Sequence, residues 1–309
     1  MITRSDIESA YERVQSYLRR TPVLKVEGDA LGIASPIVLK LEQLQHTGSF
    51  KPRGAFNALL AKDIPPAGVV AASGGNHGAA IAYAAGVLGV PARIFVPEFA
   101  GQVKIERIRG FGAEVVVTGG RFAETFQASR DYEAQSGAVL VHPFDEFETV
   151  AGQGTLGLEI EQQMPELDVL LVSVGGGGLI GGIAAWYGNR IKIVAVESEG
   201  TATLATALAN GPDAEITPSG IAASALGAPR IGAIAYEIMR DRVEQAILVS
   251  DLDIVDAQRR LWSAARLVGE PGGVTALAAL TSGAYRPAAG ERVAVLICGG
   301  NADPGWFTG

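Results

Sequence analysis

Apolar and polar residues follow two different periods along this chain, and the alternation between them predicts an α/β fold. From residue 68 onward, short apolar runs are followed by longer segments in which apolar residues recur every three or four positions. The first pattern is typical of buried strands and the second of amphipathic helices. Strands that alternate with helices imply right-handed crossovers, and therefore parallel or mostly parallel sheets with helices on both faces.

The individual elements follow from these runs. Strands are expected over residues 37–41, 69–73, 92–96, 113–117, 138–142, 168–174, 191–197, 246–250 and 292–298. Helices are expected over residues 53–61, 76–88, 102–111, 121–135, 152–163 and 251–267, up to residue 186, and from residues 201, 231 and 273. One more helix is predicted before Thr21 and Pro22, because Ser5 and Glu8 have the spacing of a capping box and apolar residues recur after them.

The order of these elements predicts two domains. The strands and helices between residues 67 and 145 are expected to form a small α/β domain. The strands before and after that segment are expected to share one sheet. Residues 1–66 and 146–309 would then form a larger, discontinuous domain into which the small domain is inserted. The Pro65-Pro66 pair marks a candidate crossing between the two.

Composition narrows the class of protein. With 309 residues, of which 48% are hydrophobic, the chain can bury a large core. A net charge of -8 without a basic cluster excludes nucleic acid and anionic membranes as expected partners, which leaves small molecules. The lone cysteine, Cys298, cannot form an internal disulfide, and the first residues are charged and amphipathic, so we expect a cytoplasmic protein.

One segment has the length of a membrane span. Residues 169–188 carry no charge, but six of the residues between 175 and 182 are glycines. Each of these would cost up to about 1 kcal/mol in a continuous helix. A short strand, a glycine turn and a helix therefore fit this segment better than a membrane helix.

Lys51 is the leading candidate for a catalytic residue. It lies between Phe50 and Pro52, where a loop containing Gly48 gives way to a helix. A partly desolvated lysine at such a position has a lowered pKa and becomes a nucleophile toward an aldehyde. The alternative is a surface lysine at the start of an ordinary helix.

Two further segments combine a strand end, glycines and a helix start. Residues 73–77 (SGGNH) would point backbone N–H groups and a helix N-terminus at a carboxylate, although a glycine-rich turn with a helix-capping Asn76 and an interior His77 is the alternative. Residues 175–178 (GGGG) would wrap a phosphate in the same way. The second segment also reads as the dinucleotide motif GxGxxG over residues 176–181, with Glu197 as the acidic partner, so a nicotinamide dehydrogenase is an alternative class.

The last predicted strand ends in Cys298-Gly299-Gly300-Asn301, at the sheet edge where parallel strands present ligand-binding residues. A buried cysteine that packs as a small hydrophobic residue is the alternative for Cys298. Together with TGSFKPRGA around Lys51, SGGNHG, AGQGTLGLEI and GEPGGVTALAAL, this ending resembles the serine/threonine dehydratase and serine racemase family of pyridoxal-phosphate enzymes. That family has the two-domain fold type II of tryptophan synthase β chain, and the resemblance covers nearly the whole chain. It implies that the larger domain binds the cofactor and that the small domain, residues 67–145, closes on the substrate.

The resemblance implies a role for each segment. Lys51 would hold the cofactor and later remove the α-proton of the substrate, and Cys298 would face the pyridine nitrogen. Cofactor contacts are expected from Phe50, Lys51, Asn76, Gly175, Gly176, Gly177, Gly178, Leu179, Glu270, Cys298 and Gly299. Contacts to the substrate carboxylate are expected from Ser73, Gly74, Gly75, Asn76 and His77.

The expected reaction is dehydration and deamination of a β-hydroxy amino acid, L-threonine or L-serine, to a 2-oxo acid and ammonia, by a homodimer. Three positions depart from the family pattern. Thr203 stands where an acid near Glu197 would complete a metal site, so no metal is expected; Ser219 replaces an aspartate; and Gly74 replaces the second serine of the SSGNH loop of serine racemases. The last change predicts a dehydratase rather than a racemase, because a glycine has no proton to return to the α-carbon.

Other enzymes of the same fold are alternatives. β-Replacement enzymes similar to cysteine synthase have lysine and carboxylate loops that read SVKDR and SGNTG, and neither motif is present here. A ligand-binding relative without activity would lose Lys51, which this chain retains.

Overall fold

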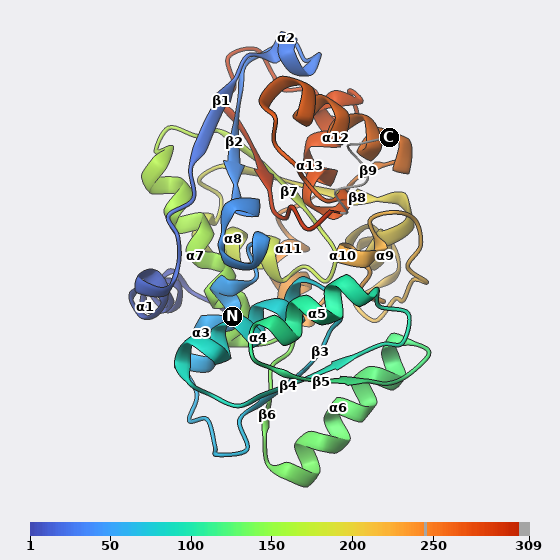
Figure 1. Cartoon of the computed structure of the whole chain (residues 1–309). Coiled ribbons are helices and arrows are strands. Elements are labelled where there is room, and N and C mark those ends of the chain that lie inside the picture. The colour runs from blue at the N-terminus through green and yellow to red at the C-terminus, as the bar shows by residue number, and fades with distance from the viewer. Residues whose placement is uncertain (244–245, 303–309) are drawn as a thin grey trace.

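The computed structural model describes residues 1–243 and 246–302, and it contains two sheets (Figure 1). The larger sheet has the order β1-β2-β10-β7-β8-β9 and is parallel except for β1, which runs antiparallel to β2. Its strands are β1 (Val23–Val26), β2 (Ile37–Leu41), β7 (Val169–Ser173), β8 (Lys192–Ser198), β9 (Ile247–Val249) and β10 (Val293–Ile297). The predicted α/β class is confirmed.

The smaller sheet has the order β5-β4-β3-β6 and is parallel throughout. Its strands are β3 (Val69–Ala72), β4 (Ala92–Val96), β5 (Glu114–Val117) and β6 (Val139–Leu140). Figure 1 shows this sheet between α4 (Asn76–Leu88) and α5 (Gln102–Gly110) on one side and α6 (Phe122–Ser136) on the other. All four strands fall within the predicted small domain, whose boundaries stay a prediction.

The remaining helices cover the larger sheet or connect its strands. They are α1 (Arg4–Val14), α2 (Gly28–Leu31), α3 (Pro52–Leu60), α7 (Phe147–Gln163), α8 (Gly178–Tyr187), α9 (Thr203–Asn210), α10 (Ala223–Leu226), α11 (Ala233–Met239), α12 (Asp251–Ala265) and α13 (Pro271–Thr281). Among the described residues, none of the helices has both the length and the apolar character needed to span a membrane.

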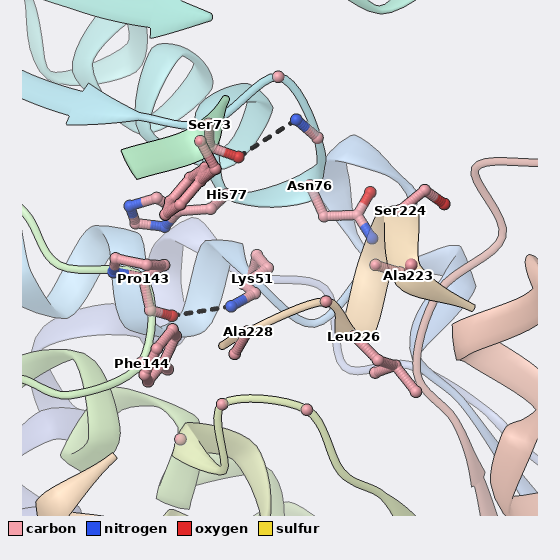
Figure 2. Close-up of a pocket in the computed structure, with 18 of the residues that line it drawn as sticks. Lys51, Ser73, Asn76, His77, Pro143, Phe144, Ala223, Ser224, Leu226 and Ala228 are labelled. Carbon is pink, nitrogen blue, oxygen red and sulfur yellow. Dashed lines mark hydrogen bonds between the residues drawn. The ribbon is translucent and has the colours of Figure 1, made fainter. Parts of the chain in front are cut away.

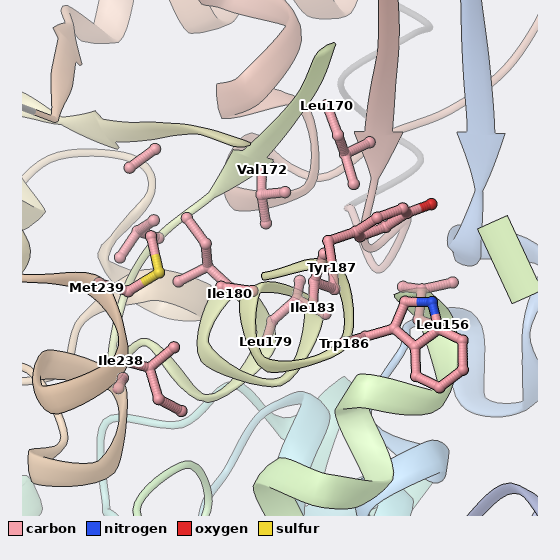
Figure 3. Close-up of a cluster of buried hydrophobic side chains, with 14 of the residues drawn as sticks. Leu156, Leu170, Val172, Leu179, Ile180, Ile183, Trp186, Tyr187, Ile238 and Met239 are labelled. Atoms are coloured by element: carbon pink, nitrogen blue, oxygen red, sulfur yellow. The ribbon is translucent and has the colours of Figure 1, made fainter. Parts of the chain in front are cut away.

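Successive side chains in the strands of the larger sheet point to opposite faces and contribute to two separate hydrophobic cores. On one face, Leu170 and Val172 of β7 pack against Ile180 and Ile183 of α8, with α7 and α11 beside them (Figure 3). On the other face, Leu171 belongs to a cluster built with α12 and α13. This period of two is what a strand buried on both faces requires.

The glycines of α7 and α8 allow these two helices to approach closely. A Cβ added to Gly154 of α7 would lie 3.0 Å from the carbonyl oxygen of Gly182 in α8. A Cβ on Gly182 would in turn overlap the backbone of α7 at Val150 and Gly154. The contact between α7 and α8 is therefore backbone against backbone, which explains the glycine content of this segment.

Several predicted elements needed correction. The capping box at the N-terminus is formed by Thr3 and Asp6 rather than by Ser5 and Glu8, so α1 begins earlier than expected. Helix α7 also begins earlier, at Phe147. The sequence analysis missed β1, because this half-exposed edge strand lacks a continuous apolar run.

A fully buried ion network lies behind the start of α3. Arg53 donates to Glu42 Oε1 and Oε2, both at 2.8 Å, and to Glu159 Oε2 at 2.9 Å. Lys40 Nζ on β2 donates to Glu159 Oε1 at 2.5 Å and to the backbone oxygen of Thr21 at 2.6 Å. The network contains two cations and two carboxylates, and each of these side chains is at most 4% exposed. It ties α3, and with it Lys51, to β2 and α7.

Candidate active site

A cavity of about 360 Å³ lies where the carboxyl ends of β3, β7 and β10 meet (Figure 2). Most of the predicted site residues line it, from the segments that follow these three strands and from the Lys51 loop. They are Phe50, Lys51, Ser73, Gly74, Gly75, Asn76, His77, Gly175, Gly176, Gly177, Gly178, Leu179 and Cys298. Glu270 and Gly299 do not line the cavity; Glu270 lies behind Asn76 and contacts it.

The Lys51 loop is fastened to the end of β10. The backbone N–H of Phe50 donates to the carbonyl oxygen of Cys298 at 3.1 Å, and Ser49 forms a β-bridge with Gly299. Lys51 then caps α3, whose first residue is Pro52. These bonds place the Lys51 side chain at the centre of the cavity, as Figure 2 shows.

The environment of Lys51 favours a neutral amine. Its Nζ donates to the carbonyl oxygen of Pro143 at 2.8 Å and lies 5.1 Å from the centre of the Phe50 ring. No carboxylate pairs with it among the described residues. Burial lowers the pKa of Lys51 to about 8, as the sequence analysis expected. A lysine with this pKa has a substantial neutral fraction near neutral pH and is a nucleophile toward aldehydes.

Residues 175–178 form a cradle that only glycines fit. A Cβ on Gly175 would lie 2.7 Å from the carbonyl oxygen of Leu226, and one on Gly176 would overlap the ring of Phe144. Gly177 has φ +85°, which disfavours any other residue. The cradle leads into α8, whose first N–H groups have no partner within the helix. This backbone arrangement suits a phosphate group.

The Ser73–His77 loop forms the opposite wall and opens α4. Ser73 Oγ accepts from the backbone N–H of Gly75 at 3.1 Å, and Gly75 is the N-cap of α4. The His77 ring is buried and its Nε2 donates to the carbonyl oxygen of Val141 at 3.0 Å. Burial lowers the pKa of His77 to about 3, so the ring is neutral. These contacts agree with the interior-histidine alternative, and a role of His77 toward a carboxylate stays a prediction.

Both ends of the Asn76 amide are engaged at the side of the cavity. Its Nδ2 donates to Glu270 Oε1 at 2.6 Å, and its Oδ1 accepts from Asn301 Nδ2 at 2.6 Å. Asn301 also donates to the carbonyl oxygen of Thr47 in the Lys51 loop, at 2.9 Å. Burial raises the pKa of Glu270. The bond between Asn301 and Asn76 shows that Asn301 orients the Asn76 amide, a role that the sequence motif did not indicate.

Cys298 contributes a neutral thiol to the floor of the cavity. Its Sγ lies 3.6 Å from the carbonyl oxygen of Gly272, as a weak donor. Burial, with the nearby Glu270 carboxyl as a second cause, raises the pKa of Cys298 to about 12. The thiol is therefore protonated at neutral pH and can face a ring nitrogen without charging it.

The Glu197 carboxylate is not free to bind a ribose, as the acidic residue of a dinucleotide site would be. Its carboxylate accepts from the backbone N–H groups of Leu204 at 2.8 Å and Ala205 at 2.9 Å, at the start of α9. The Thr203 hydroxyl lies 3.1 Å from Glu197 Oε1 and 2.5 Å from the carbonyl oxygen of Gly175. Glu197 is completely buried and caps α9, which leaves the dinucleotide alternative without its ribose ligand.

Some lining residues were not predicted from the sequence. They come from the segment after β6, from the loop after β4, from the start of α6 and from the segment around α10. The main ones are Pro143, Phe144, Pro97, Phe99, Phe122, Leu226 and Ala228. Pro143 and Phe144 follow a predicted strand directly, so their place at its carboxyl end was the one available signal.

The donor set of this cavity fits one cofactor. A nucleophilic lysine, a glycine cradle for a phosphate and a neutral thiol for a ring nitrogen match the aldehyde, phosphate and pyridine of pyridoxal phosphate. The chain belongs to the family of pyridoxal-phosphate dependent enzymes, whose model matches residues 14–299. The predicted resemblance, the fold class and the cofactor are thereby confirmed.

Three relatives show which members of this family the chain resembles. The L-threonine ammonia-lyase of Thermotoga maritima is 35% identical over 98% of this chain and 76% of its own length. The phenylserine dehydratase of Ralstonia pickettii is 36% identical over 98% of this chain and 94% of its own length. The structure of maize serine racemase superimposes with a TM-score of 0.91 and 32% identity, over 99% of this chain and 95% of the racemase.

The glycine cradle leads to a direct prediction. Gly176→Ala should weaken cofactor binding by at least about tenfold, because its methyl group would overlap the Phe144 ring and displace one wall of the cradle. Gly110→Ala is the matched control, since nothing lies within 4 Å of a Cβ at Gly110. Titration of both apo-proteins with pyridoxal phosphate, followed by visible absorption, measures the effect. Equal affinities would show that the cradle does not hold the cofactor.

Proposed function

We propose that this enzyme dehydrates and deaminates a 3-hydroxy amino acid, with L-threonine and L-serine as expected substrates, to a 2-oxo acid and ammonia. The observation that carries the proposal is Lys51, a lysine with a lowered pKa between the glycine cradle and the Ser73–His77 loop. Relatives named as ammonia-lyase and dehydratase support the same reaction class.

Each part of the cavity has a proposed task. When bound, pyridoxal phosphate supplies an electron sink for the electrons of the substrate Cα–H bond. The amides of residues 175–178 would hold its phosphate, the Cys298 thiol would face its ring nitrogen, and Asn76 would contact its phenolic oxygen. Lys51 Nζ would hold the cofactor aldehyde, and its free amine would take the proton from the substrate α-carbon.

The substrate carboxylate is placed at the start of α4. Ser73, Gly74, Gly75, Asn76 and His77 surround this helix end, where N–H groups lack helical partners and the helix dipole favours an anion. Closure of the predicted small domain on this carboxylate excludes water. We also propose a cytoplasmic homodimer; light scattering of the purified protein tests the dimer.

The decisive experiment measures two things, which are the residue that holds the cofactor and the turnover of the substrate. The purified enzyme should be yellow, release ammonia and 2-oxo acid from L-threonine or L-serine, and carry the cofactor on Lys51 after borohydride reduction. Peptide mass spectrometry locates the reduced adduct. An adduct on another lysine, or stoichiometric bound nicotinamide, would overturn the proposal.

Cys298 offers a test of the ring environment. Cys298→Ser should keep activity within about tenfold, because a hydroxyl is also a neutral donor. Cys298→Asp adds a second carboxyl close to Glu270 and favours a protonated ring nitrogen, so it should shift products away from the 2-oxo acid. Product ratios from L-serine measure the difference. If the Ser and Asp variants behave alike, Cys298 is only a packing residue.

Racemisation is the main alternative reaction, and the residue at position 74 distinguishes it from dehydration. We expect D-serine formation from L-serine to be at least about a hundredfold slower than 2-oxo acid formation, because no hydroxyl stands at residue 74. Chiral chromatography measures both rates. D-Serine that appears as fast as pyruvate would contradict the prediction.

A gain-of-function variant sharpens this test. A Cβ at Gly74 would lie 2.8 Å from Ala100 Cβ and 3.0 Å from Val96 Cγ1, so Gly74→Ser alone crowds the loop after β4. The double variant Gly74→Ser with Ala100→Gly removes the closer contact. It should form detectable D-serine, and Ala100→Gly alone, the control, should not.

A further inference from the structure

The outer part of the cavity has a different character from its floor. Beyond Lys51 and the glycine cradle, the walls come from the loop between β4 and α5, from Phe122 at the start of α6 and from the segment 223–229. These walls present Phe99, Phe122, Leu226 and Ala228. Figure 2 shows Ala223 and Ala228 across from the loop that carries Ser73 and Asn76, with the Leu226 side chain directed away from that loop. The outer part is therefore predominantly apolar.

Phe99 is the residue whose exposure asks for an explanation. It is 69% exposed at the mouth of the cavity, and Phe122 on the same rim is 39% exposed. Exposed phenyl rings at the rim of a concave site are unfavourable in water and gain free energy when a ligand covers them. Serine presents only a hydroxyl and hydrogens on Cβ, so it cannot use these rings.

The outer part also contains one charged side chain. Apart from Lys51, Lys104 is the charged lysine among the described lining residues, and no carboxylate lines the cavity within that set. The walls therefore combine several apolar side chains with a single ammonium group, and an acidic substituent is the alternative to an apolar one.

We propose that this outer part is a subsite for a large apolar substituent, preferably an aryl ring, on Cβ of the 3-hydroxy amino acid. Phe99 contacts the ring, and a 3-aryl-2-oxo acid and ammonia are the products. The Cα–H and Cβ–OH bonds break with loss of water, and one water is taken up again when the nitrogen is released as ammonia. This subsite rests on the proposed function.

Steady-state kinetics test the subsite. The kcat/KM of the holoenzyme for threo-3-phenylserine should exceed that for L-serine at least about tenfold, since even one methylene in an apolar pocket changes kcat/KM by about tenfold or more. Phe99→Ala should lower the ratio of these two values at least about fivefold, mainly through KM. Phe147→Ala is the matched control, because Phe147 is 43% exposed on α7 and does not line the cavity.

Three outcomes overturn the subsite. An L-serine or L-threonine kcat/KM equal to or above that of phenylserine, or a ratio that Phe99→Ala does not change, contradicts it. Faster turnover of 3-hydroxyaspartate than of phenylserine would assign the outer part to Lys104 and an acidic substituent instead. In these cases ammonia release from serine or threonine still supports the proposed function. Absence of ammonia from every 3-hydroxy amino acid would instead refute that function.

A binding measurement gives a readout that does not need turnover. L-Phenylalanine and L-alanine lack the leaving hydroxyl, so calorimetry can measure their affinities for the holoenzyme without elimination. L-Phenylalanine should bind at least about tenfold more tightly, and Phe99→Ala should remove most of this difference. Equal dissociation constants for the two amino acids in the wild-type enzyme would contradict the subsite.

Discussion

Lys51→Ala lowers the rate of ammonia release by about 10⁴-fold or more, because the nucleophile and the proton acceptor are lost together. The purified variant also loses the absorbance of covalently bound cofactor. Lys25→Ala is the matched control, since the Lys25 side chain is 69% exposed and lies on the edge strand β1. A Lys51→Ala enzyme with more than about one per cent of wild-type activity would refute the role of Lys51.

Lys51→Ala should also change how the free energy of unfolding of the apo-protein depends on pH. Burial lowers the pKa of Lys51 from its ordinary value of 10.5 to about 8. Between these two pH values the unfolded lysine is protonated and the folded one is neutral, so the unfolded state binds more protons. The contribution of Lys51 to the free energy of unfolding therefore rises as the pH increases from 8 to 10.5. Denaturation of both apo-proteins across this range should show that rise in the wild type and its loss in Lys51→Ala.

Arg53→Met destabilises the enzyme by about 3–5 kcal/mol, because it leaves Glu42 and Glu159 buried with only Lys40 to balance them. Chemical denaturation of the apo-protein measures this loss. Arg93→Met is the matched control, since Arg93 pairs with Glu114 at the surface, where an ion pair contributes at most about 1 kcal/mol.

Two further variants test whether the network acts as a unit. Glu42→Gln should also be destabilising, and the double variant Arg53→Met with Glu42→Gln should lose less free energy of unfolding than the sum of the single losses. Strict additivity, or a loss for Arg53→Met no greater than that for Arg93→Met, would contradict a coupled buried network. Reduced turnover in Arg53→Met would further indicate that the network positions Lys51 through α3.

Much of this site could be predicted from the sequence because its parts are local. The Lys51 loop, the Ser73–His77 loop and the glycine cradle each combine a strand end, glycines and a helix start within a few residues. Because these residues are neighbours in the sequence, their binding chemistry can be recognised without the fold. Nearly all of the predicted residues line one cavity. The predicted strands are all present, because buried parallel strands give continuous apolar runs.

What the sequence could not predict depends on tertiary contacts. Lys40 and Arg53 read as ordinary residues of a strand and a helix, and only the fold brings Glu159 to both of them. The direction of the His77 ring is decided by Val141, which lies far along the chain. Leu226 lies on a four-residue helix without an amphipathic pattern of its own, so its place in the cavity wall had no local signal.

The place of β10 in the larger sheet has a consequence for the order in which the newly made chain can fold. β10 lies between β2 and β7, although it follows both of them by more than a hundred residues in the sequence. Until residue 297 has left the ribosome, the facing edges of β2 and β7 have no partner, whereas the smaller sheet is complete once residue 140 has emerged. The smaller sheet can thus form during synthesis, but the larger sheet must wait with open edges, which are the surfaces most prone to aggregation. Since the carbonyl oxygen of Cys298 also accepts a hydrogen bond from the Lys51 loop, the cofactor site can be completed only after residue 298 has emerged.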